Sequence, residues 1–263
     1  MRTIVLLSDF GTRDPYASLM KAAIKRINPS AIIEDLTHGI QHFCIVCGAY
    51  VLYTSYLWYP ENSIYVSVVD PGVGGERRGI ILRVGDRYFV GPDNGLLWPI
   101  AEGAEEIEAY AIDEHRVSFW QVSSTFHGRD VFAPASARLS LEEEVEKFAE
   151  KIDVKSLKRL SLRWSEMSGE WRCFKVIYID SFGDTVLSAA EEEAEHVLSL
   201  GKLDVKISNQ EVGKATVSRT FSLVPEGEMA AYINSFGFLE LSINKGNFAE
   251  RFGIKVGDLI CLK

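Results

Sequence analysis

Short apolar runs alternate with helix-like segments through the first half of this chain, and this alternation limits the fold more than any other feature. Residues 4–7 and 64–69 are nearly all apolar, as expected of strands that are buried on both faces of a sheet. The segment 14–29 begins with Asp-Pro, ends with Asn-Pro and carries apolar residues at helical spacing, which predicts a helix with Asp14 as its N-cap. Residues 43–57 predict a second helix. Strands that alternate with helices favour an α/β fold with a mostly parallel sheet.

The second half differs, because its predicted elements are nearly all strands separated by glycine turns, a pattern that favours a small barrel or a sandwich. A polar, Ser-rich and basic stretch separates the two patterns. We therefore predict an α/β domain at 1–155, a linker at 156–169 and a strand-rich domain at 170–263. The further elements expected from the pattern are strands at 31–33, 80–84, 88–90, 174–179, 204–207, 215–224, 229–233, 238–243 and 259–262, and helices at 130–139, 141–152 and 189–200.

Composition excludes several classes of protein. The 263 residues carry a net charge of −9, which disfavours a duplex nucleic-acid binder because such a protein needs a basic face. The longest uncharged stretch, 43–59, is too short for a membrane span. The start of the chain has no signal-peptide pattern. We therefore expect a cytoplasmic protein with no nucleic-acid or membrane partner.

Four cysteines fit a reducing cytosol better than a disulfide scaffold. Cys44 and Cys47 form a C-x-x-C, but Cys173 and Cys261 supply no second such pair, so a zinc site is not expected. Two thiols one helical turn apart are most often packing residues, and redox chemistry is the less favoured alternative. We expect no metal site.

Two apolar runs end at an aspartate that a glycine-containing turn follows, namely Asp9, with Phe10 next to it, and Asp70. The carboxyl ends of parallel strands form the edge at which α/β proteins bind ligands. Two carboxylates there suit ribose hydroxyls or a cation, although each could instead cap its turn. His127 lies just before Asp130, the expected N-cap of the next helix. A histidine at a sheet edge can titrate near neutrality, and a structural role is the alternative.

Nucleotide-binding patterns do not fit. The chain has no G-x-x-x-x-G-K-[ST] loop, and the glycines after Asp70 lack the spacing of a dinucleotide fingerprint. The kinase-like D-F-G at 9–11 precedes the H-R-D-like segment at 127–130, which reverses the kinase order.

Four motifs become specific when they are taken in order: Ser8-Asp9-Phe10-Gly11, Val69–Gly74 with the Arg pair at 77–78, Gly91–Gly95 and Thr125–Asp130. With them the chain resembles the S-adenosylmethionine hydroxide adenosyltransferases, also called S-adenosylmethionine hydrolases (adenosine-forming), which are relatives of the fluorinase and chlorinase enzymes. The likeness covers nearly the whole chain. It implies an α/β N-terminal catalytic domain, a C-terminal β-barrel and a homotrimer with the site between subunits.

The resemblance also implies roles for individual residues. The catalytic set falls on Asp70, Arg77 and His127, and Arg77 matches better than Arg78 by spacing. The family usually has Asn where this chain has Asp184, and a carboxylate cannot donate a hydrogen bond to a ring nitrogen unless it is protonated. The substrate-binding residues implied are Asp9 for the ribose, Asp14, Asp180 and Ser235 for the methionine group, Phe182 and Asp184 for the adenine, Phe43 near the sugar, and Phe10 and Asn244 from the matching segments.

The reaction implied is the hydrolysis of S-adenosyl-L-methionine to adenosine and L-methionine, by attack of water or hydroxide at C5′. The leaving group is a neutral thioether, so we expect no proton donor, no metal and no cofactor beyond the substrate. Two alternatives stay open. One is an S-adenosylmethionine-dependent halogenase, disfavoured because the halogenases carry a halide-binding Ser at the position of Gly128 and Tyr at those of Asp70 and His127. The other is a non-catalytic sensor that binds adenosine or S-adenosylmethionine.

Overall fold

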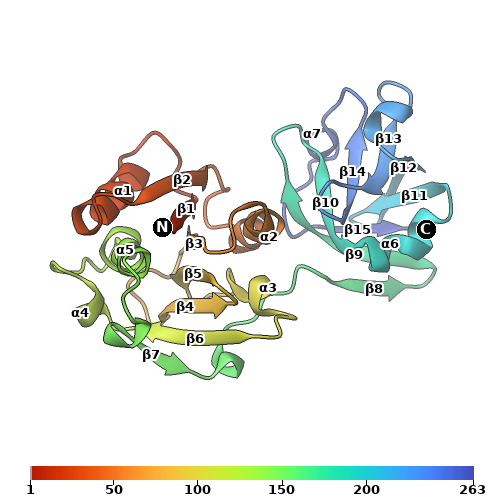
Figure 1. Ribbon diagram of the computed structural model, residues 1–263. Helices are drawn as coiled ribbons and strands as arrows, with labels where there is room; N and C mark the ends of the chain where they lie inside the picture. Colours follow the sequence, from red (N-terminus) through yellow and green to blue (C-terminus); the bar gives the residue numbers. More distant parts are fainter. Residues whose placement is uncertain (1) are drawn as a thin grey trace. The chain divides into compact units, whose positions relative to one another are not determined.

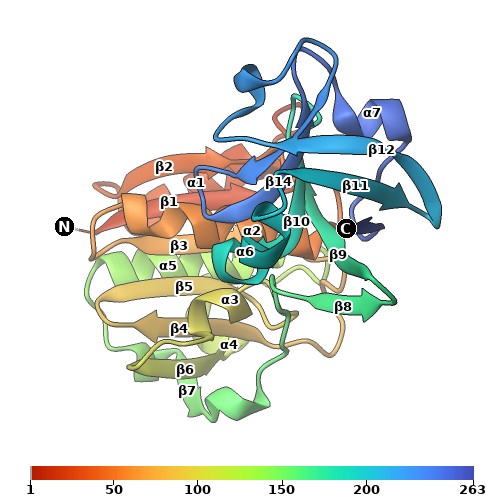
Figure 2. The same ribbon diagram turned by 90° about the vertical axis from the view of Figure 1, so that its right-hand side faces the viewer.

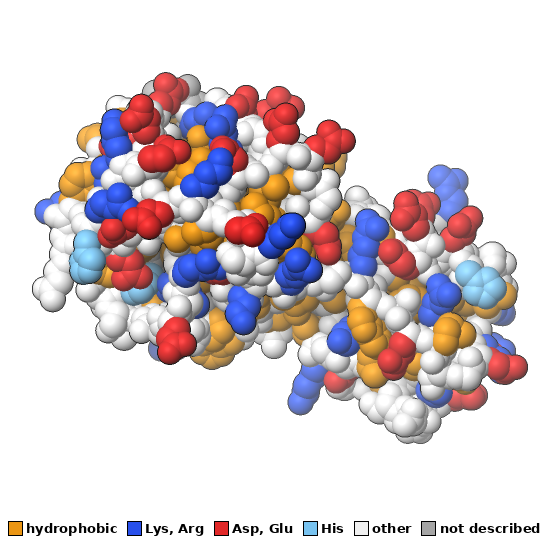
Figure 3. Space-filling view, turned by 90° about the horizontal axis from the view of Figure 1, so that it is seen from below, with side chains coloured by type: hydrophobic (Ala, Val, Ile, Leu, Met, Phe, Trp, Pro, Cys, Tyr) orange, Lys and Arg blue, Asp and Glu red, His pale blue; other side chains and the backbone are white. Residues whose placement is uncertain are grey.

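A computed structural model describes residues 2–263 of the chain, which form two compact units. The first unit runs to Leu160 and the second begins at Ser161 (Figure 1). Figure 3 shows Lys and Arg side chains intermixed with Asp and Glu over the face in view. No helix of the described residues is long and apolar enough to cross a membrane.

The first unit is built on a seven-stranded sheet whose order is β2-β1-β3-β5-β4-β6-β7 (Figure 2). The pairings of β1 with β2 and β3, and of β3 with β5, are parallel, whereas β5, β4, β6 and β7 pair antiparallel. The predicted α/β fold is thus confirmed, with the parallel part of the sheet at its start. The strands are β1 (Thr3–Ser8), β2 (Ile32–Thr37), β3 (Ile64–Val68), β4 (Gly79–Val84), β5 (Arg87–Pro92), β6 (Ile107–Ile112) and β7 (Ala149–Ile152).

Helices cover both faces of this sheet (Figure 1). Alternate side chains of β1, such as Ile4 and Leu6, join a core with Met20 and Ile24 from α1 and with the alanines of α5. On the other face, α2 packs so closely that a Cβ on Gly48 would lie 2.9 Å from Val69 Cγ2. The helices are α1 (Tyr16–Ile27), α2 (Ile45–Ser55), α3 (Trp98–Ala101), α4 (Glu114–Val117) and α5 (Ala133–Ser140), with a π-helix at Gly128–Phe132 and 3₁₀ turns at Tyr56–Trp58, Val145–Lys147 and Val154–Ser156.

Several local predictions for the first unit are wrong. Residues 141–152 form a 3₁₀ turn and the edge strand β7 rather than a helix. The strand β6 was not predicted. Helix α1 begins after Pro15, so Asp14 is not its N-cap. Asp130 lies inside the π-helix rather than at an N-cap.

The second unit is a closed β-barrel, which decides between the barrel and the sandwich. The ring runs β10-β14-β13-β12-β11-β15-β9 and closes where β9 pairs with β10. Phe174, Phe248 and Leu203 are fully buried in its core. Its elements are β8 (Ser165–Ser168), β9 (Trp171–Ile179), β10 (Thr185–Ala190), α6 (Glu191–Leu198), β11 (Lys202–Ile207), β12 (Gln210–Val217), a 3₁₀ turn (Phe221–Leu223), β13 (Met229–Ile233), β14 (Phe238–Ile243), α7 (Phe248–Phe252) and β15 (Leu259–Leu262).

Three boundaries differ from the sequence prediction in the second unit. The predicted strand at 215–224 ends at Val217, and a 3₁₀ turn follows it. Strand β10 takes the first residues of the helix expected at 189–200. Residues 165–168 of the expected linker form β8, which pairs with β9 outside the ring.

The four cysteines form two disulfides, Cys44–Cys47 and Cys173–Cys261. This corrects the expectation of free thiols that pack in a reducing environment. Cys173 and Cys261 are 88 residues apart, yet they lie opposite each other in the register of β9 and β15. Among residues 2–263, no group of three or more His, Cys, Asp or Glu side chains could hold a metal ion.

Candidate active site

Asp70 and Arg77 form a buried ion pair at the carboxyl end of β3. Arg77 Nε donates to Asp70 Oδ1 at 3.1 Å and Arg77 Nη2 donates to Asp70 Oδ2 at 2.5 Å. The side chain of Arg77 is 10% exposed and that of Asp70 is 5% exposed, so the paired geometry compensates the cost of burying both charges. Gly74 allows the loop between them to close, because a Cβ there would lie 2.1 Å from the carbonyl oxygen of Ser124.

The neighbouring Arg78 turns away from this cluster. It donates to the buried carboxylate of Asp93 and to Ser156, near the end of the first unit. Asp93 belongs to the Gly91–Gly95 motif and also accepts from the backbone N–H of Lys158. The choice of Arg77 by spacing therefore agrees with the contacts, and the Gly91–Gly95 motif serves the packing of this end of the unit.

His127 joins Asp70 and Arg77. Its Nδ1 lies 3.0 Å from Arg77 Nη2 and 3.3 Å from Glu114 Oε1. Burial lowers the pKa of His127 below 6.5; Glu114 opposes this shift and Arg77 adds to it. The imidazole is therefore neutral at pH 7 and has a nitrogen lone pair that can accept a proton.

A pocket of about 340 Å³ opens beside this cluster. Three aromatic rings, Phe10, Tyr16 and Phe126, contact one another along it with centroids 5.2–5.8 Å apart. Aromatic faces and the Asp70 carboxylate together suit a cationic ligand. The lining residues are Phe10, Tyr16, Val68, Asp70, Val73, Ser123, Thr125, Phe126, His127, Gly128 and Arg129.

Asp130 stabilises the wall of this pocket, a role that no sequence motif indicates. The carboxylate is fully buried and accepts from Trp120 Nε1 at 2.7 Å, from Ser123 N at 2.9 Å and from Arg129. Burial alone would raise its pKa, but these hydrogen bonds lower it. The π-helix that contains Asp130 begins directly after His127, and π-helices are often found at functional sites.

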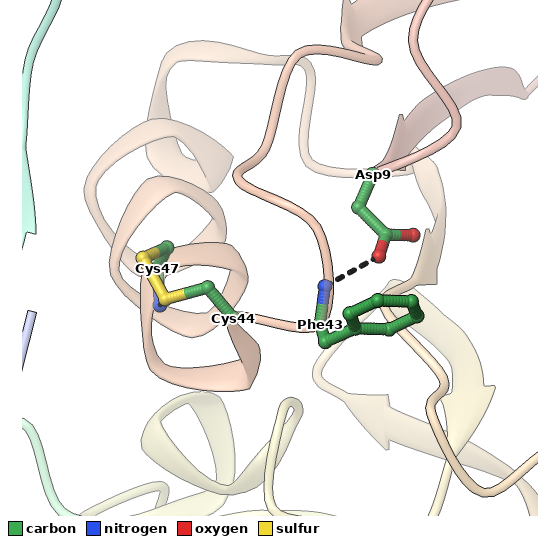
Figure 4. Close-up of a disulfide and its surroundings, with 4 residues drawn as sticks. All are labelled: Asp9, Phe43, Cys44 and Cys47. Atoms are coloured by element: carbon green, nitrogen blue, oxygen red, sulfur yellow. Dashed lines mark hydrogen bonds between the residues drawn. A yellow bond between two sulfur atoms is a disulfide. The ribbon is translucent and has the colours of Figure 1, made fainter.

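Asp9 lies at the end of β1, and its carboxylate Oδ2 accepts from the backbone N–H of Phe43 at 2.8 Å (Figure 4). The structure thus brings two predicted substrate residues together. Phe43 has a left-handed φ of 65° and is 71% exposed. Asp14 is exposed in the turn before α1. The Cys44–Cys47 disulfide begins α2 immediately after Phe43 (Figure 4).

Three of the five residues predicted in the second unit, Asp180, Phe182 and Asp184, lie in the β9–β10 turn. Asp180 Oδ1 accepts from the backbone N–H groups of Phe182 and Asp184, each at 2.9 Å. This turn presents Phe182, a residue that is 75% exposed, at a cavity of about 570 Å³. The cavity is lined by Phe182, Asp184, Phe221, Ile243, Lys245, Gly246 and Asn247.

Asp184 is the unusual carboxyl group of this cavity. Burial, together with the charges of Asp180 and Glu240, raises its pKa to about 7. Burial likewise raises the pKa of Glu240, which accepts from Tyr232 at 2.6 Å and from Asn234 at 2.9 Å. No sequence motif indicates this network, because Glu240 has the pattern of an ordinary strand residue.

Ser235 and Asn244 lie elsewhere in the barrel. Ser235 is exposed in the turn between β13 and β14. Asn244 follows β14 and donates through Nδ2 to the carbonyl of Val224 at 2.7 Å, so it braces a loop and does not line the cavity. The ligand roles of both residues stay predictions.

The protein therefore consists of an α/β unit followed by a β-barrel unit. The α/β unit holds a buried carboxylate–guanidinium–imidazole cluster that can orient and deprotonate a small nucleophile. The chain belongs to the S-adenosylmethionine hydroxide adenosyltransferase family. Residues 4–149 match the N-terminal domain of that family and residues 174–261 match its C-terminal domain.

Individual relatives agree with this assignment. The chain is 34% identical to the (R)-S-adenosyl-L-methionine hydrolase of Thermus thermophilus, over 98% of both chains. A fluorinase of Nocardia brasiliensis is more distant, at 24% identity over 99% of this chain and 96% of that protein. The crystal structure of an uncharacterized conserved protein from Thermotoga maritima superposes with a TM-score of 0.87, at 33% identity over 99% of both chains.

Proposed function

We propose that this protein hydrolyses (R)-S-adenosyl-L-methionine to adenosine and L-methionine. The observation that carries the proposal is the buried Asp70–Arg77–His127 cluster on a pocket that suits a cation, in a chain 34% identical to a protein with that name.

The cluster accounts for the chemistry in one step. An oxygen of water forms a bond to C5′, the C5′–S bond breaks, and its electron pair neutralises the sulfonium. The thioether that leaves is neutral, so only the nucleophile needs assistance. Asp70 already accepts from Arg77 through both oxygens, which leaves neutral His127 as the acceptor of the water's proton.

Positioning of the substrate and the water contributes the remainder of the rate enhancement. Arg77 Nη1 is buried and has no hydrogen-bond partner among the described residues, so it is available to a substrate or water oxygen. The aromatic rings of Phe10, Tyr16 and Phe126 offer a favourable surface for the sulfonium. Holding water in line with the C5′–S bond makes the attack on C5′ effectively unimolecular. Effective molarities of well-oriented reactions of this kind reach about 10⁵ M or more.

The remaining parts of the proposal follow from the family resemblance. We place the ribose at Asp9, the adenine between Phe182 and Asp184, and the methionine group at Asp14, Asp180 and Ser235. The active form is a homotrimer whose sites lie between subunits, and it needs neither a metal nor a cofactor. The exposed Phe43 and Phe182 rings fit surfaces that a substrate or a second subunit covers. We place the protein in the cytoplasm, as the sequence analysis expects.

Halogenation is the second candidate, and the packing around Gly128 disfavours it. A Cβ at this position would lie 3.3 Å from Met20 Sδ, Phe10 Cζ and Phe126 Cε2. The halide-binding Ser of the halogenases would therefore crowd three side chains here. A non-catalytic sensor would bind substrate and leave it unchanged.

The test is incubation of the purified protein with S-adenosyl-L-methionine in ¹⁸O-water, with and without added chloride. Hydrolysis puts ¹⁸O into the 5′-hydroxyl of adenosine. Formation of 5′-chloro-5′-deoxyadenosine would identify a halogenase instead, and tight binding without any product would identify a sensor. Asp70→Ala is expected to lose turnover but keep binding, whereas Asp86→Asn, in an exposed turn of the same unit, should behave as the wild type.

A further inference from the structure

Glu114 faces the candidate catalytic histidine, although no sequence motif includes it. Its Oε1 lies 3.3 Å from His127 Nδ1. Glu114 is the first residue of α4, and the Asp113 carboxylate fixes that turn by accepting from the backbone N–H groups of His115 and Arg116. The Glu114 side chain is 38% exposed, so it reaches the ring from the solvent side of the cluster.

Arg77 and Glu114 compete for one ring atom. A guanidinium can only donate and a carboxylate can only accept, whereas Nδ1 carries either a lone pair or a proton. When Nδ1 accepts from Arg77, the proton of the neutral ring is on Nε2, which then cannot act as a base. When Nδ1–H points to Glu114, Nε2 keeps its lone pair. The choice of partner therefore decides whether Nε2 can deprotonate water.

We propose that Glu114 is a positioning residue that holds His127 in the tautomer with a free Nε2 and stabilises the imidazolium formed when Nε2 takes the proton from water. This inference rests on the proposed hydrolysis. Proton balance is simple: one proton moves from water to Nε2, and Nδ1–H stays directed at Glu114. The arrangement performs the task that the buried aspartate performs for the histidine of a serine protease.

The charges around His127 agree with this role. Glu114 faces the ring from α4, Asp70 from the end of β3, Asp130 from the π-helix and Arg77 from the loop before β4. Burial is the main reason that the pKa of His127 is low, and Glu114 is the largest influence that raises it. Removal of the Glu114 charge therefore lowers this pKa further. The acidic limb of the pH–rate profile should then move to lower pH while the plateau falls.

Two substitutions separate the charge of Glu114 from its hydrogen-bonding capacity. Glu114→Ala removes both, and we expect kcat to fall about tenfold, less than the ~10⁴-fold loss seen when a fully buried aspartate is replaced by its amide. Glu114→Gln keeps an acceptor oxygen, so it should restore part of kcat while its acidic limb shifts as in the alanine variant. KM should stay within about twofold in both, since Glu114 does not line the pocket.

Glu150→Gln is the matched control. Glu150 is an exposed carboxylate of β7. It pairs at 2.9 Å with Arg116, which belongs to α4 as Glu114 does, and it does not contact the His127 ring. It should leave kcat, KM and the pH profile unchanged. Equal kcat values and equal pH–rate profiles for the wild type and both Glu114 variants would overturn the proposal.

A direct reading of the tautomer does not depend on catalysis. The ¹⁵N chemical shifts of labelled histidine rings distinguish Nδ1–H from Nε2–H, and His127→Gln identifies the signals of His127. We expect Nδ1–H in the wild type and Nε2–H in Glu114→Ala. Nε2–H in the wild type would overturn the proposal. If the spectra agree but no variant or wild type hydrolyses the substrate, the proposed function fails and the contact stands.

Discussion

Asp184 gives the most quantitative prediction, because its carboxyl group sits half-buried between the charges of Asp180 and Glu240. Replacing it by Asn keeps the shape and removes the titration. The pKa of Asp184 in the folded protein is about 7, against 3.8 for an unperturbed carboxyl. The neutral acid is thus the form that the fold favours.

The magnitude follows from proton linkage. A folded pKa raised from 3.8 to about 7 sets an upper limit of about 4 kcal/mol, at about 1.4 kcal/mol per pH unit. Because the carboxyl is only half-buried, solvent screening reduces the expected contribution to about 1–2 kcal/mol. The sign is fixed because the unfolded carboxyl loses its proton first. The stability contributed by the neutral acid is fully present below pH 3.8 and is lost as the pH rises to about 7. The free energy of unfolding of Asp184→Asn should therefore equal that of the wild type near pH 4 and exceed it by about 1–2 kcal/mol at pH 8.

Chemical denaturation of the full chain between pH 4 and pH 9 measures this difference. Glu228→Gln, which removes an exposed charge from the same unit, is the control, and its stability should change with pH as that of the wild type does.

A second readout is KM, which should rise above pH 7 in the wild type and stay constant in Asp184→Asn, because only the protonated acid or the amide can donate a hydrogen bond to adenine. If wild type and Asp184→Asn show the same pH dependence of unfolding, the carboxyl ionises normally and the reasoning is refuted.

Three further substitutions test other parts of the structure. Asp70→Asn should lower kcat at least about 100-fold in a steady-state assay, because Arg77 loses its charged partner at the reacting centre; a near-normal kcat would remove Asp70 from the mechanism. Gly128→Ser should cost about 1–3 kcal/mol in thermal unfolding, since its Cβ meets three side chains at 3.3 Å, and unchanged stability would show that the site has room for a halide-binding residue. Cys173→Ser should cost about 2–5 kcal/mol through loss of a bond that joins residues 88 apart, and equal unfolding of the two proteins under non-reducing conditions would contradict that disulfide.

The edge that carries the site could be predicted from the chain. Alternating strands and helices imply a parallel sheet, and a parallel sheet places the ends of its strands together. The pairing of β1 with β3 brings Ser8 opposite Val68, so Asp9 and Asp70 follow neighbouring strand ends. Arg77 could be chosen because it lies within reach of Asp70 along one loop. Such inferences depend only on local order and on one general property of sheets.

Contacts between distant segments could not be predicted in this way. Leu141, Val145, Phe148 and Ile152 have helical spacing, but pairing with β6 makes the last of them part of an edge strand. The contact of Glu114 with His127 could not be predicted for the same reason. Glu114 approaches His127 only when β6 and α4 have formed, and β6 was not predicted from the sequence. The Cys173–Cys261 pair depends on the register of β9 with β15, which no spacing in the sequence reveals.

The buried carboxylates of the first unit show which substitutions should affect stability and which should affect chemistry. Asp9 accepts from the backbone of Phe43, and fully buried Asp130 accepts from Trp120, Ser123 and Arg129. These bonds form on folding, and leaving such donors unpaired costs about 1–3 kcal/mol each. Loss of Asp130 should therefore lower stability and activity together. Glu114 is partly exposed and reaches the site through one ring atom, so its loss should lower kcat while the unfolding temperature stays constant.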